Sequence, residues 1–366
     1  MTLPLPGDLE RFLRSRLPHH RLAEVQPLRA DAGAAGIATE KGSGSGIPLR
    51  LGLVDEDTGE RRDLVLHFAA ANDFGHDRRA DRADEMLLAY DTFPAIPHQA
   101  PALDVGVVDV HGRLCSLRDA GEFWLLTDWA PGRVYAEDLR RIATTGEASP
   151  ADVARAQALA RCLVELHIKV DNDPAVYARA IRDLVGHGEG IFGIVDGYPA
   201  DVAGAPGARL QAIEARCVEW RWRLKHRHHR LARTHGDFHP FNVVLGDDDA
   251  ITLLDASRGG RGDPADDATC MAINYVFFAL QQERRAWPRG MGLLWRAFWA
   301  TYLDGTGDTE LGEVAAPFFA WRALVLCNPR WYPEVAADAR ERLLGLIERL
   351  LVGPRFAPEL AEELFA

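Results

Sequence analysis

Hydrophobic and polar positions alternate differently in the two parts of the chain. Before residue 130, short apolar or alternating runs predict strands, and helical spacing is confined to residues 7–17 and 78–93. After residue 130, apolar positions recur every three to four residues, which predicts a mostly helical second part. The strands predicted in the first part are 47–54, 63–68, 102–110, 113–117 and 123–129. The helices predicted in the second part are 151–167, 176–185, 210–224 and most of the chain after 267, with short strands at 242–245 and 251–254.

The change of pattern falls at a cluster of residues that interrupts regular structure. Ala130-Pro131-Gly132-Arg133 ends the last apolar strand of the first part. Ser149 followed by Pro150 then forms a favourable helix start, with serine as N-cap and proline at the first helical position. We therefore predict an α+β protein with a strand-rich part over residues 1–123, a connection over 124–133 and a helical part over 134–366.

Composition restricts the class of protein but not its activity. The chain has 366 residues, of which 47% are hydrophobic and 26% charged, enough for two packed units. The net charge of -12 argues against nucleic-acid binding; it would suit a cationic substrate, but it also simply keeps a protein soluble. Five widely spaced cysteines without a C-x-x-C pair, no N-terminal signal pattern and no run of about 18 apolar residues predict a cytoplasmic protein without a membrane span.

Most of the chemical information lies in residues 234–269. His235-Gly236-Asp237 is followed by Asn242, and Asp255 ends a predicted strand. Phosphoryl transfer needs one carboxylate at the attacking hydroxyl and further side-chain oxygens that hold magnesium against the phosphates. Magnesium prefers hard oxygen ligands such as carboxylates and amides. A tight loop beside a hairpin can bring these three oxygen-bearing side chains together.

The segment resembles the catalytic core of the aminoglycoside phosphotransferase family, which is related to choline kinases. The family pattern H-G-D-x-H-x-x-N, then I-D and G-D-P-x-x-D, is matched apart from Leu254 in place of isoleucine. The resemblance implies a two-lobed protein-kinase-like fold, with an antiparallel sheet in the N-terminal lobe and a larger helical lobe. It implies Asp237 as the catalytic base, and Asn242 and Asp255 as Mg2+ ligands. The residues implied to be structural in the catalytic loop are His235, His239 and Asp267.

The same resemblance assigns nucleotide binding to the first part and the connection. Residues 124–133 look like the hinge of the family, and backbone groups of Asp128, Trp129 and Ala130 would hold the adenine of ATP, or the guanine of GTP. The glycine-rich stretch before residue 47 fits either a loop that covers the phosphates or a flexible linker. Its candidate residues are Gly42, Gly44 and Gly46.

The base that contacts the phosphates in this family is missing from its usual place. The third strand of the family carries a lysine or arginine that pairs with a helix carboxylate, whereas this chain has His67 there. Three interpretations remain open: His67 contacts phosphate, Lys41 or an arginine replaces it, or strong ATP use has been lost. A histidine in a strand is also often only a half-buried structural residue. The carboxylates of the next predicted helix are Asp81, Asp84 and Glu85, and we select Glu85 as the pairing residue.

Three other features have structural interpretations. Residues 188–193 match G-x-G-x-x-G but lack a preceding strand, which argues against a dinucleotide site. The basic segment 221–233 fits a solvated helix end better than a metal or nucleic-acid site. The late tryptophans have the spacing of core residues rather than of a cage around a cationic substrate. They are Trp287, Trp295, Trp299, Trp321 and Trp331.

Two functional hypotheses follow, with no prediction of the oligomeric state. The first is an ATP- and Mg2+-dependent kinase that acts on a small-molecule hydroxyl, on an aminoglycoside-like compound, an amino alcohol or a sugar. The second is a catalytically weak kinase-like module that binds nucleotide or a partner protein, which the missing strand lysine favours. A protein kinase is disfavoured, because the chain after Asp255 reads G-D-P-x-x-D rather than an activation loop ending in A-P-E.

Overall fold

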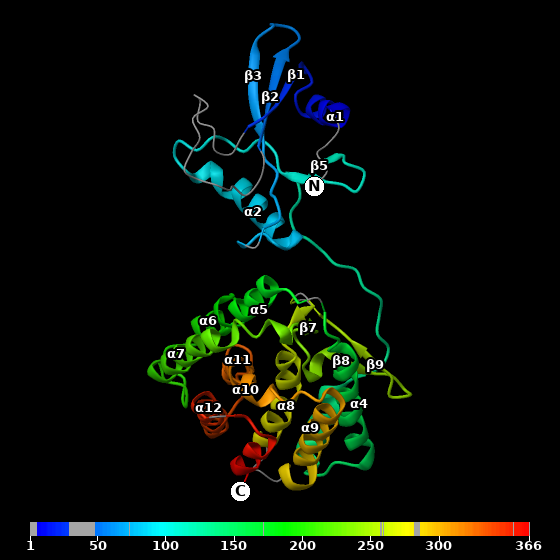
Figure 1. Cartoon of the computed structure of the whole chain (residues 1–366), viewed down its shortest axis with the longest axis vertical. Coiled ribbons are helices and arrows are strands. Elements are labelled where there is room, and N and C mark those ends of the chain that lie inside the picture. The colour runs from blue at the N-terminus through cyan, green and yellow to red at the C-terminus, as the bar shows by residue number, and fades with distance from the viewer. Residues whose placement is uncertain are drawn as a thin grey trace. The chain divides into compact units, whose positions relative to one another are not determined.

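In the computed structural model, the described residues are 6–28, 48–72, 74–170, 172–256, 258, 260–281, 286–353 and 355–365. The chain divides into two units, Met1–Thr127 and Asp128–Ala366, each with a hydrophobic core of its own (Figure 1). Helices and small antiparallel sheets occur together, so the predicted α+β class is confirmed.

An antiparallel sheet forms the centre of the first unit. Its strands β1 (His20–Pro27), β2 (Leu49–Asp55) and β3 (Arg61–Leu66) pair in that order. Alternate leucines of β2 are buried together with the apolar side of helix α1 (Pro6–Arg16). The buried leucines are Leu9, Leu13, Leu49, Leu51 and Leu53. The unit also contains helix α2 (Arg79–Thr92) and the hairpin of β4 (Gly106–Val108) and β5 (Leu114–Ser116).

Two features of the chain before residue 130 differ from the sequence predictions. Strand β1 is not among the predicted strands, because most of its side chains are exposed and it lacks a continuous apolar alternation. The strand predicted at 123–129 is wrong: the segment has no regular structure, and Trp124, Leu125 and Trp129 are largely exposed. An apolar run becomes a strand only where a neighbouring backbone satisfies its N–H and C=O groups, and no described strand pairs with this segment.

Helix α8 (Ala265–Leu280) is the central element of the second unit. Nearly every side chain of α8 is buried, as expected for a helix that is covered on all sides. It packs against α3, α4, α9, α11 and α12, several of which surround it in Figure 1. The bounds of these helices are Tyr135–Thr145, Pro150–Leu166, Gly292–Thr306, Ala316–Cys327 and Ala337–Val352. The remaining helices are α5 (Pro174–Gly186), α6 (Ile191–Asp196), α7 (Gly207–Leu224) and α10 (Leu311–Val314).

The late tryptophans mostly belong to this core. Trp287, Trp295, Trp299 and Trp321 are at most 4% exposed, which confirms the structural interpretation for these four. Trp331 is 55% exposed, so the core prediction is wrong at that position. None of the described helices is both long and apolar enough to cross a membrane.

Two small sheets tie the motif segment together. Strands β6 (Arg133–Val134), β8 (Val243–Leu245) and β9 (Ile251–Leu253) form an antiparallel sheet in the order β6-β8-β9. Strand β7 (Ala232–Arg233) pairs with β10 (Arg261–Gly262). Strand pairing therefore joins two connections to each other at both ends: the β7–β8 loop and the β9–β10 segment.

The G-x-G-x-x-G stretch is a tight turn between two helices. Helix α5 precedes it and α6 begins at Ile191, so the strand that a dinucleotide site requires is absent from this described stretch. A Cβ atom on Gly193 would lie 1.9 Å from the carbonyl oxygen of Gly188. Close backbone approach therefore explains this glycine without a ligand.

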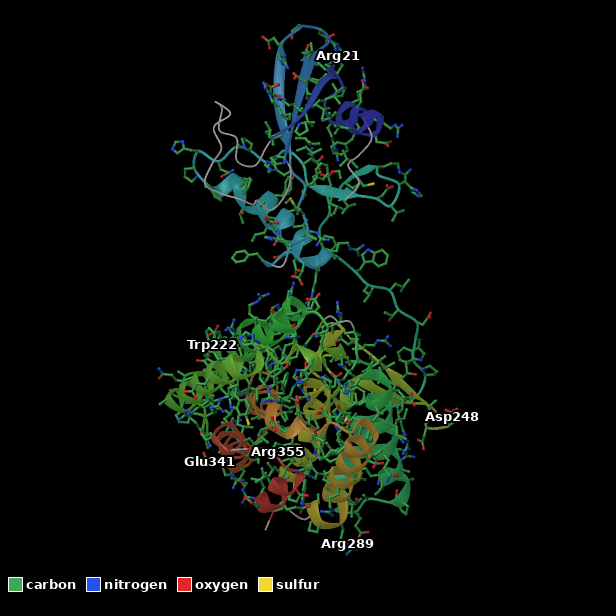
Figure 2. All side chains as sticks on the ribbon, in the orientation of Figure 1. Arg21, Trp222, Asp248, Arg289, Glu341 and Arg355 are labelled. Atoms are coloured by element: carbon green, nitrogen blue, oxygen red, sulfur yellow. The ribbon has the colours of Figure 1, made fainter. Side chains whose placement is uncertain are left out.

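The basic segment 221–233 begins at the exposed end of α7. Figure 2 shows Trp222 on the outer side of this helix, where 60% of it is exposed. The Lys225 ammonium lies 3.6 Å from the centre of the Trp222 ring. These contacts are those of a solvated helix end. The solvated interpretation is wrong at Arg230 of the same segment, which is buried and forms an ion pair with Asp263.

Replacing Gly193 by alanine is expected to destabilise the second unit. The added methyl group would overlap the Gly188 carbonyl, and relief of such overpacking costs about 1–3 kcal/mol of unfolding free energy. Gly186→Ala is the matched control, since nothing lies within 4 Å of its Cβ position. Urea unfolding of both variants measures the difference, and equal stabilities would contradict the prediction.

Candidate active site

The loop that carries Asp237 is held by the buried carboxylate of Asp267, in the first turn of α8. The two Asp267 oxygens accept hydrogen bonds from the backbone N–H groups of His235 at 2.7 Å and Gly236 at 2.8 Å. His167, at the end of α4, places Nε2 3.1 Å from the same carboxylate. Gly236 has a φ of 84°, a conformation that glycine adopts at little cost. Asp267 therefore determines the course of the loop immediately before Asp237.

Asp267 is ionised despite its burial. Burial raises the pKa of this carboxyl, but the His167 ring and the two backbone N–H groups outweigh burial and hold the pKa below its usual value. The loop is also braced by His235, whose Nδ1 accepts a hydrogen bond from the Asp237 backbone N–H at 3.2 Å. His235 and Asp267 thus both contact the backbone of the loop.

The two carboxylate oxygens of Asp237 have different surroundings. Oδ1 accepts a hydrogen bond from Arg322 Nη1 at 2.7 Å. Among the described residues, Oδ2 has only longer contacts, 3.5 Å to His239 Nε2 and 3.9 Å to Arg258 Nη2. The Asp237 side chain retains 16% of its exposure. Oδ2 is therefore the oxygen with capacity for a further hydrogen bond.

Asp237 is an anion with weak basicity. Burial raises its pKa, but His239, 3.5 Å from Oδ2, and the positive charges of Arg322 and Arg258 outweigh burial and hold the pKa well below its usual range. Such a carboxylate can orient a hydroxyl group and accept its proton late in a reaction. In phosphoryl transfer through a loose transition state, positioning of this kind contributes more than early deprotonation.

Asn242 and Asp255 are connected through backbone hydrogen bonds. Asn242 Nδ2 donates to the Asp237 carbonyl oxygen at 3.1 Å, and the Asn242 carbonyl accepts from the Leu254 N–H at 2.9 Å. Asp255 follows directly, with a φ of 56°, which is uncommon for a residue other than glycine. In the part of the chain that the structure describes, the Asn242 amide oxygen and the Asp255 carboxylate have no hydrogen-bond or ion-pair partner.

These two free groups have the chemistry of a magnesium site. An amide oxygen and a carboxylate oxygen are hard ligands, and magnesium usually takes only one or two such groups in addition to phosphate and water. No group of three His, Cys, Asp or Glu side chains among the described residues is placed to hold a metal. A site completed by phosphate oxygens does not require such a group, so the donor set fits the ion.

Arg322, which contacts the motif from α11, is not among the site residues predicted from the sequence. Its guanidinium bonds to Asp237, to the Gly236 carbonyl at 2.8 Å and to Asp266 Oδ1 at 2.5 Å. The available signal is a single arginine within the apolar helix PFFAWRALVLC, because a charge in such a helix must find buried partners. The pattern does not say which carboxylates these partners are.

Asp266, the residue before Asp267, was missed as well. Burial and the neighbouring Asp267 charge raise its pKa to about 6, although Arg322 acts in the opposite direction. Adjacent residues of α8 thus have opposite environments: Asp267 receives the loop N–H groups, and Asp266 holds the arginine that contacts Asp237.

The G-D-P turn is anchored by a second buried ion pair. Arg230 contacts both Asp263 oxygens at 2.8 and 2.9 Å, and Tyr177 donates its hydroxyl to the same carboxylate at 2.7 Å. Arg230 also bonds to Asp308, two residues after the end of α9. The turn that leads into α8 is therefore fixed by residues from distant parts of the second unit.

The predicted nucleotide-binding residues of the first unit and of the connecting segment are less well supported by contacts. His67 lies one residue beyond β3 and is exposed, so it is not on the strand as expected. Glu85 lies 3.3 Å from His76 Nε2, so its partner is His76 and not His67. Asp128, Trp129 and Ala130 lie in the segment without regular structure. Lys41 and the candidate glycines Gly42, Gly44 and Gly46 lie outside the described residues.

A comparison with protein-family models decides the family of the chain. Residues 56–300 match the model described as "Phosphotransferase enzyme family". The chain belongs to the phosphotransferase enzyme family. The match includes the whole segment from His235 to Asp267, and it confirms the resemblance inferred from that segment.

Solved phosphotransferases of several kinds are similar to this family member. A glucosamine kinase complex with glucosamine, ADP and inorganic phosphate has 18% identity over 63% of this chain and 57% of its own, with a TM-score of 0.35. The ethanolamine kinase of Plasmodium vivax has 12% identity, coverage of 93% and 80%, and a TM-score of 0.33. Aminoglycoside phosphotransferase APH(3'')-Id of Streptomyces rimosus has 16% identity, coverage of 96% and 100%, and a TM-score of 0.34. No curated protein sequence matches.

Asp266 is expected to make the phosphotransferase more stable at mildly acidic pH. Its folded-state pKa of about 6 lies above the usual aspartate value, so the folded protein binds the proton more tightly than the unfolded chain. The unfolding free energy of the wild type, relative to Asp266→Asn, should therefore rise by about 1 kcal/mol from pH 7 to pH 5. Denaturant titrations at the two pH values measure this difference.

The pH window separates Asp266 from the other two aspartates. The lowered pKa values of Asp237 and Asp267 mean that their contributions are present above the usual aspartate pKa and are lost only below it. An unchanged difference between wild type and Asp266→Asn from pH 7 to pH 5 would show that Asp266 does not titrate in this range.

Proposed function

We propose that this protein transfers the γ-phosphoryl group of ATP, or of GTP, to a hydroxyl group of a small molecule. The observation that carries the proposal is the hydrogen-bonded loop in which Asp237 is an anion with one oxygen free of close contacts. The Asn242 amide oxygen and the Asp255 carboxylate, whose segments are joined by the hydrogen bond from the Leu254 N–H to the Asn242 carbonyl, have no partner among the described residues. A carboxylate for the acceptor and two oxygens for a metal are the side chains that this chemistry requires.

In this proposal Asp237 acts on the acceptor hydroxyl. Its Oδ2 accepts the hydroxyl hydrogen and directs the oxygen lone pair toward the γ-phosphorus. The bond from the γ-phosphorus to the β,γ-bridging oxygen breaks, the bond to the acceptor oxygen forms, and the hydroxyl proton passes to Asp237. The weak basicity of Asp237 is consistent with late proton transfer.

Asn242 and Asp255 would hold Mg2+ through the amide oxygen and the carboxylate. Bound magnesium neutralises charge on the phosphate oxygens. The hydrogen bond from Asn242 Nδ2 to the Asp237 carbonyl turns the amide oxygen away from that carbonyl, so one residue braces the loop and offers a ligand. For the nucleotide we keep the backbone of Asp128, Trp129 and Ala130 as candidates, with His67 as a candidate phosphate contact.

We propose classes of acceptor compound rather than one acceptor molecule. Aminoglycosides, amino alcohols and sugars are the acceptors implied by the sequence resemblance, and each has a primary or secondary hydroxyl group. We therefore propose a screen of these three classes with MgATP and MgGTP as donors.

Nucleotide binding should depend on Asp255. Isothermal calorimetry of the wild type is expected to show MgATP or MgGTP binding that weakens at least about tenfold in Asp255→Ala, because a charged metal ligand is lost. Asp248→Ala is the matched control: it removes an exposed carboxylate at the turn of the same β8–β9 hairpin, where Figure 2 shows it pointing outward. Absence of wild-type binding at millimolar nucleotide would overturn the kinase proposal, whereas binding without turnover would favour a nucleotide-binding module.

Turnover should depend on Asp237. The substitution Asp237→Asn preserves the size of the side chain and removes its charge, and loss of a positioned base lowers kcat by about 10²–10⁴-fold. The nucleotide dissociation constant should change little, because Asp237 is assigned to the acceptor and not to the metal. Coupled detection of ADP with an acceptor from the screen measures kcat; a variant with wild-type turnover would exclude Asp237 from this role.

A further inference from the structure

Arg322 is a buried cation in a helix of apolar residues. It is 5% exposed, and α11 packs directly against α8, as Figure 1 also shows. A buried charge costs several kcal/mol of stability unless it is paired and hydrogen-bonded. The partners of Arg322 therefore identify the part of the protein that this buried arginine holds in place.

All three hydrogen-bond acceptors of Arg322 belong to the Asp237 loop or its support. Nη1 donates to Asp237 Oδ1, and Nη2 donates to the Gly236 carbonyl and to Asp266 Oδ1. The guanidinium also lies 3.8 Å from the centre of the Trp321 ring, and Arg258 lies 4.7 Å from the same ring. The guanidinium is thus constrained by two carboxylates, one carbonyl and one aromatic face.

The geometry has a consequence for Asp237. A guanidinium presents its donors in a planar, fixed arrangement, so an anchored arginine also fixes the carboxylate that it binds. Because Arg322 occupies Oδ1, rotation of the Asp237 carboxylate would exchange a 2.7 Å charged hydrogen bond for weaker contacts. One particular oxygen, Oδ2, is thereby left for an acceptor.

We propose that Arg322 is a positioning residue for Asp237: anchored by Asp266, it holds Oδ1 so that Oδ2 is presented to the acceptor hydroxyl. This inference rests on the proposed phosphotransferase function and adds a residue from outside the motif to that site. Arg322 acts through Asp237 and is assigned no contact with the substrate.

Arg340 provides a matched control for the loss of a buried arginine. It is also 5% exposed and lies in the same unit. Its guanidinium bonds only to backbone carbonyls among the described residues, those of Cys327, Ala203 and Val335, at 2.8–3.1 Å. Replacement of Arg340 therefore reports general destabilisation without a direct effect on Asp237.

Kinetics of Arg322→Lys and Arg340→Lys form the first test. Lysine keeps the positive charge but lacks the planar guanidinium that donates to several acceptors at once. Arg322→Lys should therefore lower kcat by about 10–100-fold. The nucleotide KM should change less than about twofold, because Arg322 is assigned no contact with the nucleotide. Arg340→Lys should retain kcat at a temperature where both variants are folded by circular dichroism. Equal kcat values for the two variants would overturn the proposal.

Carbon-13 NMR at fixed neutral pH forms the second test and does not require turnover. The Asp237 carboxylate signal is assigned by its absence in Asp237→Asn. Its chemical shift should change in Arg322→Met, because the charged hydrogen bond to Oδ1 is lost. It should keep the wild-type value in Arg340→Met, which removes a guanidinium that bonds to other groups.

The two tests separate failure of the inference from failure of the proposed function. If the wild type binds nucleotide and transfers phosphate, but Arg322→Met leaves the Asp237 signal and kcat unchanged, only the positioning role is overturned. If no acceptor is phosphorylated while Arg322→Met still shifts the Asp237 signal, the contact with Asp237 is supported and the catalytic proposal fails. An Asp237 signal that is the same in Arg322→Met and Arg340→Met excludes the contact itself.

Discussion

The buried carboxylate of Asp267 is the contact on which the arrangement of the site depends. A carboxylate inside a protein is stable only if its oxygens receive strong hydrogen bonds. Here the donors are the backbone N–H groups of His235 and Gly236 and the ring of His167. The loop and the helix therefore require one another: the loop keeps this shape because Asp267 binds it, and Asp267 can be buried because the loop supplies donors.

The surrounding fold makes this contact rigid. Asp267 lies on α8, which is buried on nearly all sides by the other helices of the second unit. The Arg230–Asp263 ion pair holds the turn before α8, and Arg322 reaches the loop from α11. A site built from loop residues thus obtains the precision of packed helices, which catalytic positioning requires. The positive groups near Asp237 also keep it ionised at neutral pH.

Agreement between sequence and structure is best where interactions are local. Ser149 caps α4 by accepting the Asp152 N–H, as the Ser-Pro pair predicts, and the strands on both sides of the acidic turn form the β8–β9 hairpin. Agreement is poorest where a segment depends on distant partners. The apolar run at 123–129 has strand composition without a strand partner, and the electrostatic partner of Glu85 is His76 rather than His67.

By itself, the sequence determined the phosphotransferase family, the α+β class and the set of oxygen-bearing residues in the motif, because these follow from residue types at short and regular spacings. Only the tertiary structure decided what surrounds Asp237. Arg322 is 85 positions away along the chain, and its partners Asp237 and Asp266 meet it only when α11 packs on α8. Spacing along a chain indicates which groups can meet locally. Burial, charge pairing and the different surroundings of the two Asp237 oxygens arise only when distant helices pack together.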